Sequence, residues 1–180
     1  MHQNSQQELV ERARGGDPDA WESLYLNVYP RLRSYASSRA GTDAADDLVG
    51  ETMARAVASI GKFRWEPSGF DAWLFGILRR VCFEHLRRQN RRRREPAFLS
   101  VDTLLQPGED LELSDDHTEM RRAFSRLSPK ERELLELRLV SGLTVDEVAR
   151  VLGKRAGAIR TAQSRAVANL RQLLDGARCD

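Results

Sequence analysis

Apolar residues recur at helical spacing along most of this chain. Between Asp17 and Gly41 they return every three or four residues, as one face of a helix requires. Asp17 and Pro18 supply a capping residue and a proline at the first helical position, and Gly41 interrupts the pattern. The stripe consists of Trp21, Leu24, Tyr25, Val28, Leu32 and Tyr35. The pattern predicts one long amphipathic helix.

Three more helices are predicted before residue 95. A capping-box pattern from Ser5 to Glu8 opens a short helix that ends at Gly15-Gly16. Another starts at Thr42 or Asp43, and the next runs from about Phe70 into a run of arginines. The apolar positions of these two are Leu48, Val49, Met53, Ala56, Val57 and Ile60, then Trp73, Leu74, Ile77, Leu78, Val81 and Leu86. The loop between them carries Phe63, Arg64, Trp65 and Pro67.

The segment from Ser128 to Leu174 predicts three further helices. Ser128-Pro129-Lys130-Glu131 combines a hydroxyl cap, a proline at the first helical position and a glutamate that can reach back to the cap. Gly142 can close this helix in the left-handed conformation, and Thr144 then caps a short helix that stops at Gly153. The apolar run of the first helix is Leu134, Leu135, Leu137 and Leu139.

The last two of these helices have the pattern of a helix-turn-helix. After a tight turn the final helix runs from about Ala156, with basic and small polar residues opposite its apolar face. That apolar face holds Ile159, Ala166, Leu170 and Leu173. A short helix, a glycine turn and a longer helix of this kind can present a helix to the DNA major groove. A plain helical hairpin is the alternative for the same pattern.

The chain is predicted to be all-α, with two small helical domains. No stretch alternates apolar and polar residues as a strand would. Residues 96–115 contain proline, glycine and acidic residues without a sustained helical period, which indicates a linker. We therefore place a four-helix domain at about 1–95, an acidic flexible linker at 96–116 and a second helical domain at 117–178.

Charge is distributed unevenly along the chain. The formal net charge is only +2 over 180 residues, and this value by itself does not point to any kind of partner. Between Arg87 and Arg94, however, six of eight residues are arginine, whereas 96–120 has no lysine or arginine. That interval instead holds Asp102, Glu109, Asp110, Glu112, Asp115, Asp116 and Glu119. A basic block followed by an acidic block suggests two surfaces with different partners.

No signature of an enzyme is present in the sequence. There is no glycine-rich phosphate loop, no nucleophile elbow and no histidine-rich metal motif. Cys82 and Cys179 are too few and too far apart for a disulfide framework or a zinc site. Paired acids of the third helix could hold magnesium as in nucleases, but a solvated acidic face is far more common. Without a membrane-spanning run or signal-peptide pattern, we expect a cytoplasmic protein without a metal or other cofactor.

The fourth helix and the loop before it suit strand-separated DNA. Arg79, Arg80 and Arg87 can neutralise phosphates, and aromatic or arginine planes can hold a base that has left the stack. The alternative is structural: Trp73 belongs to the core, Trp65 anchors the loop and the arginines form a solvated helix end.

These segments resemble a known family. Residues 45–52 (ADDLVGET) resemble the region 2.2 motif of extracytoplasmic-function (ECF, group IV) bacterial sigma factors. Residues 70–80 (FDAWLFGILRR) are similar to their region 2.3–2.4 helix, and 127–166 resembles their region 4. Three motifs in the right order, with an acidic linker between them, cover most of the chain.

The resemblance implies a subunit that gives RNA polymerase its promoter specificity and is not itself an enzyme. The third helix would dock on the clamp of the largest polymerase subunit, through Asp46, Asp47, Leu48, Glu51 and Arg55. The loop and fourth helix would melt and read the −10 element, through Phe63, Arg64, Trp65, Ser68, Arg79, Arg80, Glu84 and Arg87. The last domain would read the −35 element, through Arg155, Arg160, Thr161, Ser164 and Arg165.

The resemblance also implies partners. The last domain would sit on the flap of the β subunit, and the acidic linker would thread towards the active-site cleft and RNA exit path. Core RNA polymerase and promoter DNA are then the partners, and the family implies an anti-sigma factor that holds the chain inactive.

The chain departs from the family pattern at both DNA-reading helices. Members commonly carry Arg-Asn where this chain has Arg79-Arg80, and Asp where it has Glu84. The resemblance therefore does not define which −10 bases this helix reads. In the last helix, Ala158, Ala162 and Gln163 stand where threonine, arginine and leucine are frequent. On a helical wheel Gln163 falls on the inner face, so we expect it at the edge of the core and not among the base readers.

Two other functions remain as alternatives. A stand-alone DNA-binding regulator would use the helix-turn-helix with an N-terminal sensing or dimerisation domain, but it would need neither the acidic linker nor a docking helix. A nuclease built on the acidic helix would cleave DNA only with a divalent metal.

Overall fold

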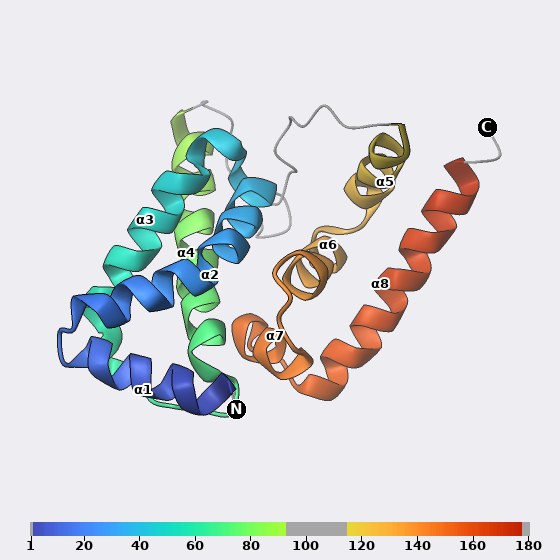
Figure 1. Cartoon of the computed structure of the whole chain (residues 1–180). Coiled ribbons are helices and arrows are strands. Elements are labelled where there is room, and N and C mark those ends of the chain that lie inside the picture. The colour runs from blue at the N-terminus through green and yellow to red at the C-terminus, as the bar shows by residue number, and fades with distance from the viewer. Residues whose placement is uncertain (1, 93–114, 178–180) are drawn as a thin grey trace.

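Capping residues and glycines divide the chain into its helices. The computed structural model describes residues 2–92 and 115–177, and these ranges contain helices and no strand, which confirms the all-α prediction for them. The elements are α1 (His2–Arg14), α2 (Pro18–Ala40), α3 (Thr42–Ser59), the 3-10 helix η1 (Ile60–Lys62), α4 (Gly69–Arg92), α5 (Asp115–Arg126), α6 (Pro129–Leu135), the π-helix η2 (Glu136–Val140), α7 (Val145–Leu152) and α8 (Ala156–Ala177). Figure 1 shows α1–α4 on one side of the molecule and α5–α8 on the other.

The N-terminal domain, α1–α4, forms as its sequence predicts. Asp17 caps α2, its Oδ1 accepting hydrogen bonds from the backbone N–H of Asp19 at 3.0 Å and of Ala20 at 3.3 Å. Gly41 ends α2 at a φ of 85°, a conformation that favours glycine. The stripe of α2 packs against α3 and α4, and its Tyr35 ring meets Phe75 edge to face at 5.9 Å.

The C-terminal domain, α5–α8, contains the predicted helix-turn-helix. Both capping boxes form, at Ser128 of α6 and at Thr144 of α7. Gly142 and Gly153 adopt φ values of 64° and 63°, which end the helices before α7 and α8 in the left-handed region. Of these local signals, Gly153 lies in the turn between α7 and α8.

The structure corrects the course of two predicted helices. Helix α1 begins at His2, not at Ser5, because the residues before Ser5 include no glycine or proline to stop the helix. The apolar run of α6 passes into the π-helix η2, in which the Ser141 N–H donates to the Glu136 carbonyl five residues earlier at 2.9 Å. The extra residue in this turn rotates Leu139 outward, where it is 62% exposed.

The predicted linker lies almost wholly outside the described residues. Of the range 96–116, Asp115 and Asp116 fall in the first turn of α5. None of the helices that the structure describes is long and apolar enough to cross a membrane.

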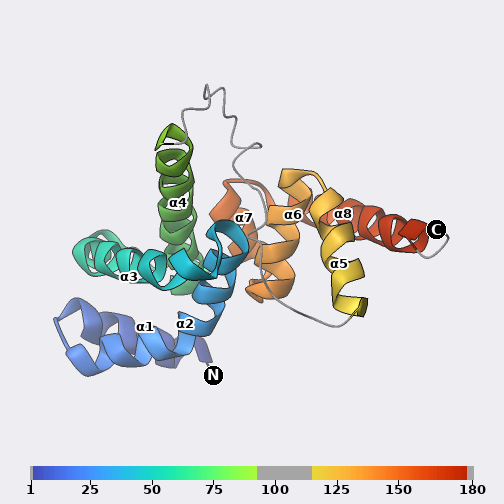
Figure 2. The same ribbon diagram turned by 90° about the horizontal axis from the view of Figure 1, so that it is seen from above.

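The two domains pack directly against each other. Helix α7 lies on α4, and η2 lies on α2, as the two views together show (Figures 1 and 2). Buried apolar side chains of both domains form one continuous cluster, to which the C-terminal domain contributes Leu134, Leu137, Leu143, Val148, Ala149, Val151 and Ile159. A smaller cluster joins α5, α6 and α8 through Leu127, Leu135 and Ala166.

Candidate nucleic-acid interface

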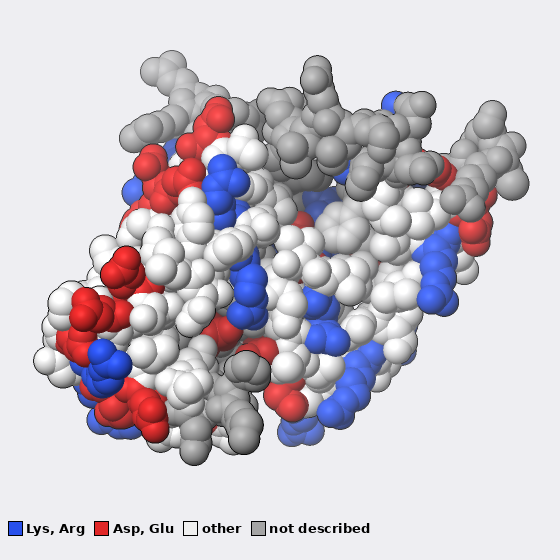
Figure 3. All heavy atoms as spheres, in the orientation of Figure 1, with Lys and Arg blue, Asp and Glu red and all other residues white. Residues whose placement is uncertain are grey.

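The outer face of α8 presents basic side chains to solvent. Ile159 and Ala166 are buried on the inner face of the helix, which fixes its rotation. Arg155, Arg160 and Arg165 are exposed, and none of them forms an ion pair within the described part of the chain. Figure 3 shows basic side chains along the C-terminal domain, whereas acidic ones gather over the N-terminal domain.

The two hydroxyl residues of this face are partly engaged by the helix itself. Thr161 Oγ1 donates to the Gly157 carbonyl at 3.2 Å, and Ser164 Oγ donates to the Arg160 carbonyl at 3.1 Å. Each hydroxyl oxygen keeps its acceptor sites, so both exposed side chains can still accept a hydrogen bond from a base edge.

Gln163 lies at the edge of the core, as the helical wheel predicts. The side chain is half-buried, and its Oε1 accepts a hydrogen bond from Arg138 Nε of η2 at 2.9 Å. Arg138 also donates to the Leu143 carbonyl, so the same guanidinium joins η2, the turn before α7 and α8. The Gln163 side chain is therefore fixed by a contact within the C-terminal domain and does not point freely into solvent.

The basic face of α4 is divided between solvent and the other domain. Arg80 and Arg87 are exposed. Arg79 instead reaches the C-terminal domain, where its Nε donates to Glu133 Oε1 at 2.7 Å and its Nη2 donates to Oε2 at 3.3 Å. The two carboxylate oxygens occupy the side of the guanidinium that a phosphate would otherwise contact.

The loop at residues 61–69 is anchored by its first aromatic residue. Phe63 is 4% exposed and packs on the rings of Trp65, Phe70 and Trp73, with ring centroids 5.9, 5.7 and 5.1 Å away. The expectation that Phe63 itself meets a base does not fit this burial, because its ring is already enclosed by the core. Trp65 and Ser68 are half-buried, and Arg64 is exposed.

The acidic residues of α3 differ in their surroundings. Asp46 accepts hydrogen bonds from Tyr29 OH at 2.7 Å and Arg33 Nε at 3.0 Å, and the Tyr29 hydrogen bond holds the pKa of Asp46 below its ordinary value. Asp47 is exposed on the same helix. Leu48 is 2% exposed and belongs to the core, so it supports the surface from beneath and cannot itself make a contact there.

Arg55 connects the predicted docking surface to α4. Its Nη2 lies 2.6 Å from Glu51 Oε1 and 2.6 Å from Glu84 Oε2, while Nη1 donates to Glu84 Oε1 at 3.2 Å. The hydrogen bond from Arg55 lowers the pKa of Glu84. Glu84, expected among the −10 residues, is thus joined to Glu51 and Arg55 of the docking set by one ionic network.

Sequence reasoning missed the charged residues buried between the domains. Arg39, Glu133 and Glu136 are each at most 6% exposed. Arg39 follows Tyr35 by four residues on the apolar face of α2, and this spacing was a usable signal. Glu133 lies in α6 and Glu136 in η2, both in the leucine-rich run that follows the capping box, and the sequence gives no sign that these two carboxylates are buried.

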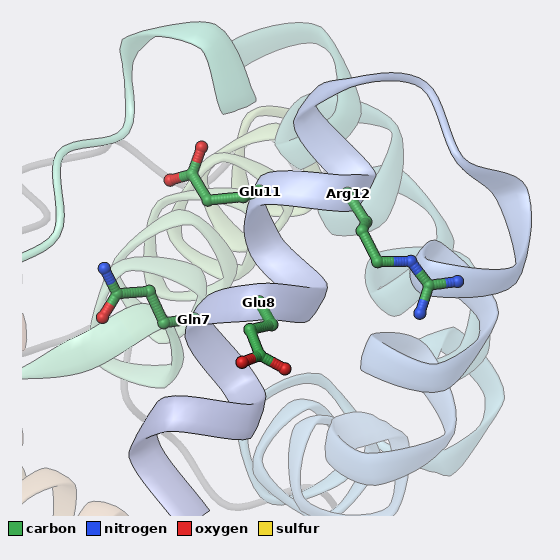
Figure 4. A pocket seen from close by; sticks show the side chains of 4 residues that line it. All are labelled: Gln7, Glu8, Glu11 and Arg12. Carbon is green, nitrogen blue, oxygen red and sulfur yellow. The ribbon is translucent and has the colours of Figure 1, made fainter.

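An open depression on the surface of α1 carries no convergent chemistry. Its lining side chains come from this one helix, and Figure 4 shows them pointing in different directions: Gln7, Glu8, Glu11 and Arg12. The basic faces of α4 and α8 remain the best-formed candidate sites.

Two family models match the chain. Sigma-70 region 2 matches residues 24–92, and Sigma-70, region 4 matches residues 117–170. The first covers α4 with most of the N-terminal domain, and the second covers the helix-turn-helix.

Curated relatives match both domains together. ECF RNA polymerase sigma factor EcfG of Rhodopseudomonas palustris is 40% identical over 164 residues, which cover 88% of each protein. ECF RNA polymerase sigma factor BldN of Streptomyces coelicolor is 38% identical over 172 residues, 93% of this chain; the chain spans 65% of the length of BldN.

Solved structures share the arrangement. The sigma factor RpoE, in complex with the anti-sigma factor NepR from Bartonella quintana, is similar with a TM-score of 0.67 and 28% identity, over 86% of this chain and 96% of RpoE. CnrH, in complex with the cytosolic domain of CnrY, is similar with a TM-score of 0.63 and 25% identity, over 93% of this chain and 96% of CnrH. Together with the two basic faces and the helix-turn-helix, these likenesses show that the chain belongs to the ECF sigma factors, which direct RNA polymerase to specific promoters to initiate transcription.

Proposed function

We propose that α8, together with Arg155 immediately before it, reads the −35 element through Arg155, Arg160, Thr161, Ser164 and Arg165. The observation that carries this proposal is the set of exposed arginines without ion pairs on the outer face of a helix-turn-helix. A major-groove reader needs side chains that are free to reach base edges and phosphates. Small residues between the arginines let the backbone come close to the DNA.

The loop at 61–69 and α4 melt and read the −10 element in this proposal. Arg80 and Arg87 contact phosphates, and Arg79 joins them when it is released from Glu133. Arg64, Trp65 and Ser68 face the displaced strand, while Phe63 holds the loop in place from the core. Glu84 acts through Arg55 and orients the surface of α4 beside the DNA.

The N-terminal domain binds the clamp of the largest polymerase subunit through α3. Asp46, Asp47 and Glu51 provide negative charge there, and Arg55 keeps Glu51 in position at 2.6 Å. The C-terminal domain sits on the β-subunit flap. Residues 96–116, with their acidic composition, thread towards the basic active-site cleft and RNA exit path.

We also propose that an anti-sigma factor binds this chain, as NepR and the cytosolic domain of CnrY bind the two similar sigma factors. The protein acts in the cytoplasm, beside the polymerase, and has no catalytic activity of its own.

Run-off transcription on a genomic promoter library, with core polymerase and this chain, tests the proposal. We expect transcripts only when both are present, and weak binding of duplex promoter by the chain alone. Tight duplex binding without polymerase would instead support the DNA-binding regulator. Cleavage of the template that requires a divalent metal would support the nuclease.

A further inference from the structure

Four charged side chains meet where the two domains pack, and we call them the interdomain charge cluster: Arg39, Arg79, Glu133 and Glu136. Arg39 Nη2 lies 2.7 Å from Glu136 Oε2 and 3.7 Å from Glu133 Oε1. Arg79 Nε binds the same Glu133 oxygen at 2.7 Å. Tyr35 OH donates to that oxygen as well, at 3.4 Å. Glu133 and Glu136 of the C-terminal domain are thus paired with Arg39 of α2 and Arg79 of α4 in the N-terminal domain.

The same interface occupies residues of the −10 surface. Arg79 is held by Glu133, and Glu66 of the loop at 61–69 lies 3.0 Å from Arg150 Nη2 of α7. Arg31 of α2 adds a third contact, its Nε donating to the Ser141 carbonyl at 2.7 Å. Helix α7 itself lies on α4. The packed arrangement therefore covers part of the surface that would face DNA.

The interdomain charge cluster is buried at a cost. Arg39 is 2% exposed, and within the described residues none of its guanidinium nitrogens has a well-aligned hydrogen-bond acceptor. Arg39 and Glu136 therefore form an ion pair whose geometry does not meet that of a hydrogen bond. Buried ions that lack hydrogen bonds gain little net stability, yet removing one partner leaves an uncompensated charge. Such a cluster specifies one packing of the domains while leaving separation accessible.

We propose that the interdomain charge cluster is an autoinhibitory latch that holds the C-terminal domain on α4 and withholds Arg79 from DNA until the domains separate. The closure itself is independent of the proposed function; the masking of DNA contacts rests on the proposed role of α4.

Single-molecule energy transfer without DNA tests the closure. Dyes are placed at Glu22→Cys and Gln172→Cys, both exposed, in a Cys82→Ala, Cys179→Ser background, because Cys82 lies beside the cluster and opening would expose its thiol. Glu133→Arg puts a third positive charge beside Arg39 and Arg79, and we expect the open-to-closed ratio to rise on the order of a hundredfold. The matched control is Asp175→Arg, the same reversal on the exposed end of α8. An unchanged distribution in Glu133→Arg would overturn the latch.

A charge swap separates the latch from a folding defect. Adding Arg79→Glu to Glu133→Arg restores an opposite-charge pair, and we expect the closed population to return in large part. Circular dichroism of each variant should match that of the wild type. If the swapped chain stays as open as Glu133→Arg alone, pairing across the interface is not what closes the molecule.

A cross-link tests the masking. Glu66→Cys and Arg150→Cys, joined by a short bismaleimide in the Cys82→Ala, Cys179→Ser background, lock the domains together. The locked chain should bind a fluorescent oligo-dT strand about tenfold more weakly than the single-cysteine chains treated alike, as expected for lost charge-assisted contacts. Equal binding would overturn the masking. Arg79→Ala, tested in the Glu133→Arg chain, reports separately on the DNA role: unchanged binding there contradicts the proposed function and leaves the closure intact.

Discussion

Arginine occupies three different environments at the residue scale in this protein. Arg39 is buried between domains, Arg55 links two surface glutamates, and Arg160 extends into solvent. The guanidinium keeps its charge in all three, so its partners decide its role. A group already paired at short distance must give up that pair before it can contact DNA. Exposed arginines without ion pairs are therefore the first candidates for sequence readout.

Arg160→Ala should relax the base preference at one position of the −35 element. A bidentate contact from arginine to guanine discriminates by about 1–3 kcal/mol, whereas a phosphate contact weakens all sequences alike. Selection of −35 sequences by the variant holoenzyme measures the effect. Arg171→Ala, farther along α8, is the matched control and should leave the preference intact. A uniform loss of affinity for all −35 sequences would mean that Arg160 contacts the DNA phosphates and not the bases.

Gln163→Ala should lower stability more than specificity. The change removes the hydrogen bond with Arg138 Nε at 2.9 Å, and such a bond contributes about 1 kcal/mol. We expect thermal unfolding to shift down by about 2–4 °C, as for chains of this size. Gln172→Ala, an exposed residue on the same helix, should not move the transition. Altered −35 bases with an unchanged transition would mean that the reading face includes Gln163.

At the scale of elements, the 61–69 loop combines an internal anchor with an exposed edge. The Phe63 ring packs on Phe70 and Trp73, which fixes where the loop joins α4. Arg14 Nη2 adds a hydrogen bond to the Phe63 carbonyl at 2.9 Å. A loop held at one end can keep Trp65 and Arg64 at a fixed height above α4. Rigid positioning of this kind lets a short loop act on a displaced strand.

Phe63→Ala should destabilise the N-terminal domain by about 3–5 kcal/mol, because it leaves a cavity among aromatic rings. Chemical denaturation measures the loss. Arg64→Ala, its exposed neighbour, should change the free energy of unfolding by less than about 0.5 kcal/mol. If Phe63→Ala unfolds like the wild type and yet fails on duplex but not pre-melted promoters, Phe63 acts on DNA directly.

Asp47→Arg should weaken the binding of core polymerase without altering the fold. Asp47 is exposed on α3, and a like-charge contact at a charged interface costs several kcal/mol. Quantitative co-purification with core polymerase measures the loss, with circular dichroism to verify the helices. Glu22→Arg on α2 gives the same charge reversal elsewhere on this domain. Equal recovery of Asp47→Arg and wild type would contradict the proposed docking surface.

At the scale of the whole molecule, local features were predictable and the domain interface was not. Helices α2, α6 and α7 followed from caps at Asp17, Ser128 and Thr144, whose partners are two or three residues away. The ion pair of Arg79 with Glu133 joins residues 54 apart, and no periodicity encodes such a pairing. The π-turn of η2 likewise depends on packing, so the apolar run gave no sign that Leu139 would turn outward. Of the candidate site, exposure on α8 was predicted correctly, whereas the burial of Phe63 needed the structure. Leu48 stood both in the apolar stripe of its helix and in the docking set, and the structure places it in the core.

The closed arrangement should become more favourable as the pH falls from about 7 towards 4.5. Burial raises the pKa of Glu136 to about 7, well above the ordinary value of a glutamate, against the opposing field of Arg39. Between these two pKa values the closed form binds a proton that the open form releases. The titratable and charged groups that face Glu136 are Tyr35 and Arg39 of α2, Cys82 of α4, and Arg132 and Glu133 of α6. The stabilisation is complete below the pKa of the open form and is lost as the pH rises through 7.

Energy transfer between the two labelled domains measures this dependence. Between pH 7 and 4.5, the closed-to-open ratio should rise by up to about tenfold for each unit by which the pH falls. Glu136→Gln mimics the protonated carboxyl and should flatten the profile. A profile with the opposite slope would show that Glu136 stays ionised when the domains are closed.

The continuous apolar cluster also bears on how this subunit competes for polymerase. Opening would wet side chains such as Leu134 and Val148, so the open form is a minority species of the free chain. A partner that binds only the open form sees an affinity reduced by the open fraction. Substitutions in the cluster that trim one methyl group would enlarge this fraction without touching a polymerase or DNA contact. For such a partner, the packing of this apolar cluster would determine how well the chain competes with other sigma factors.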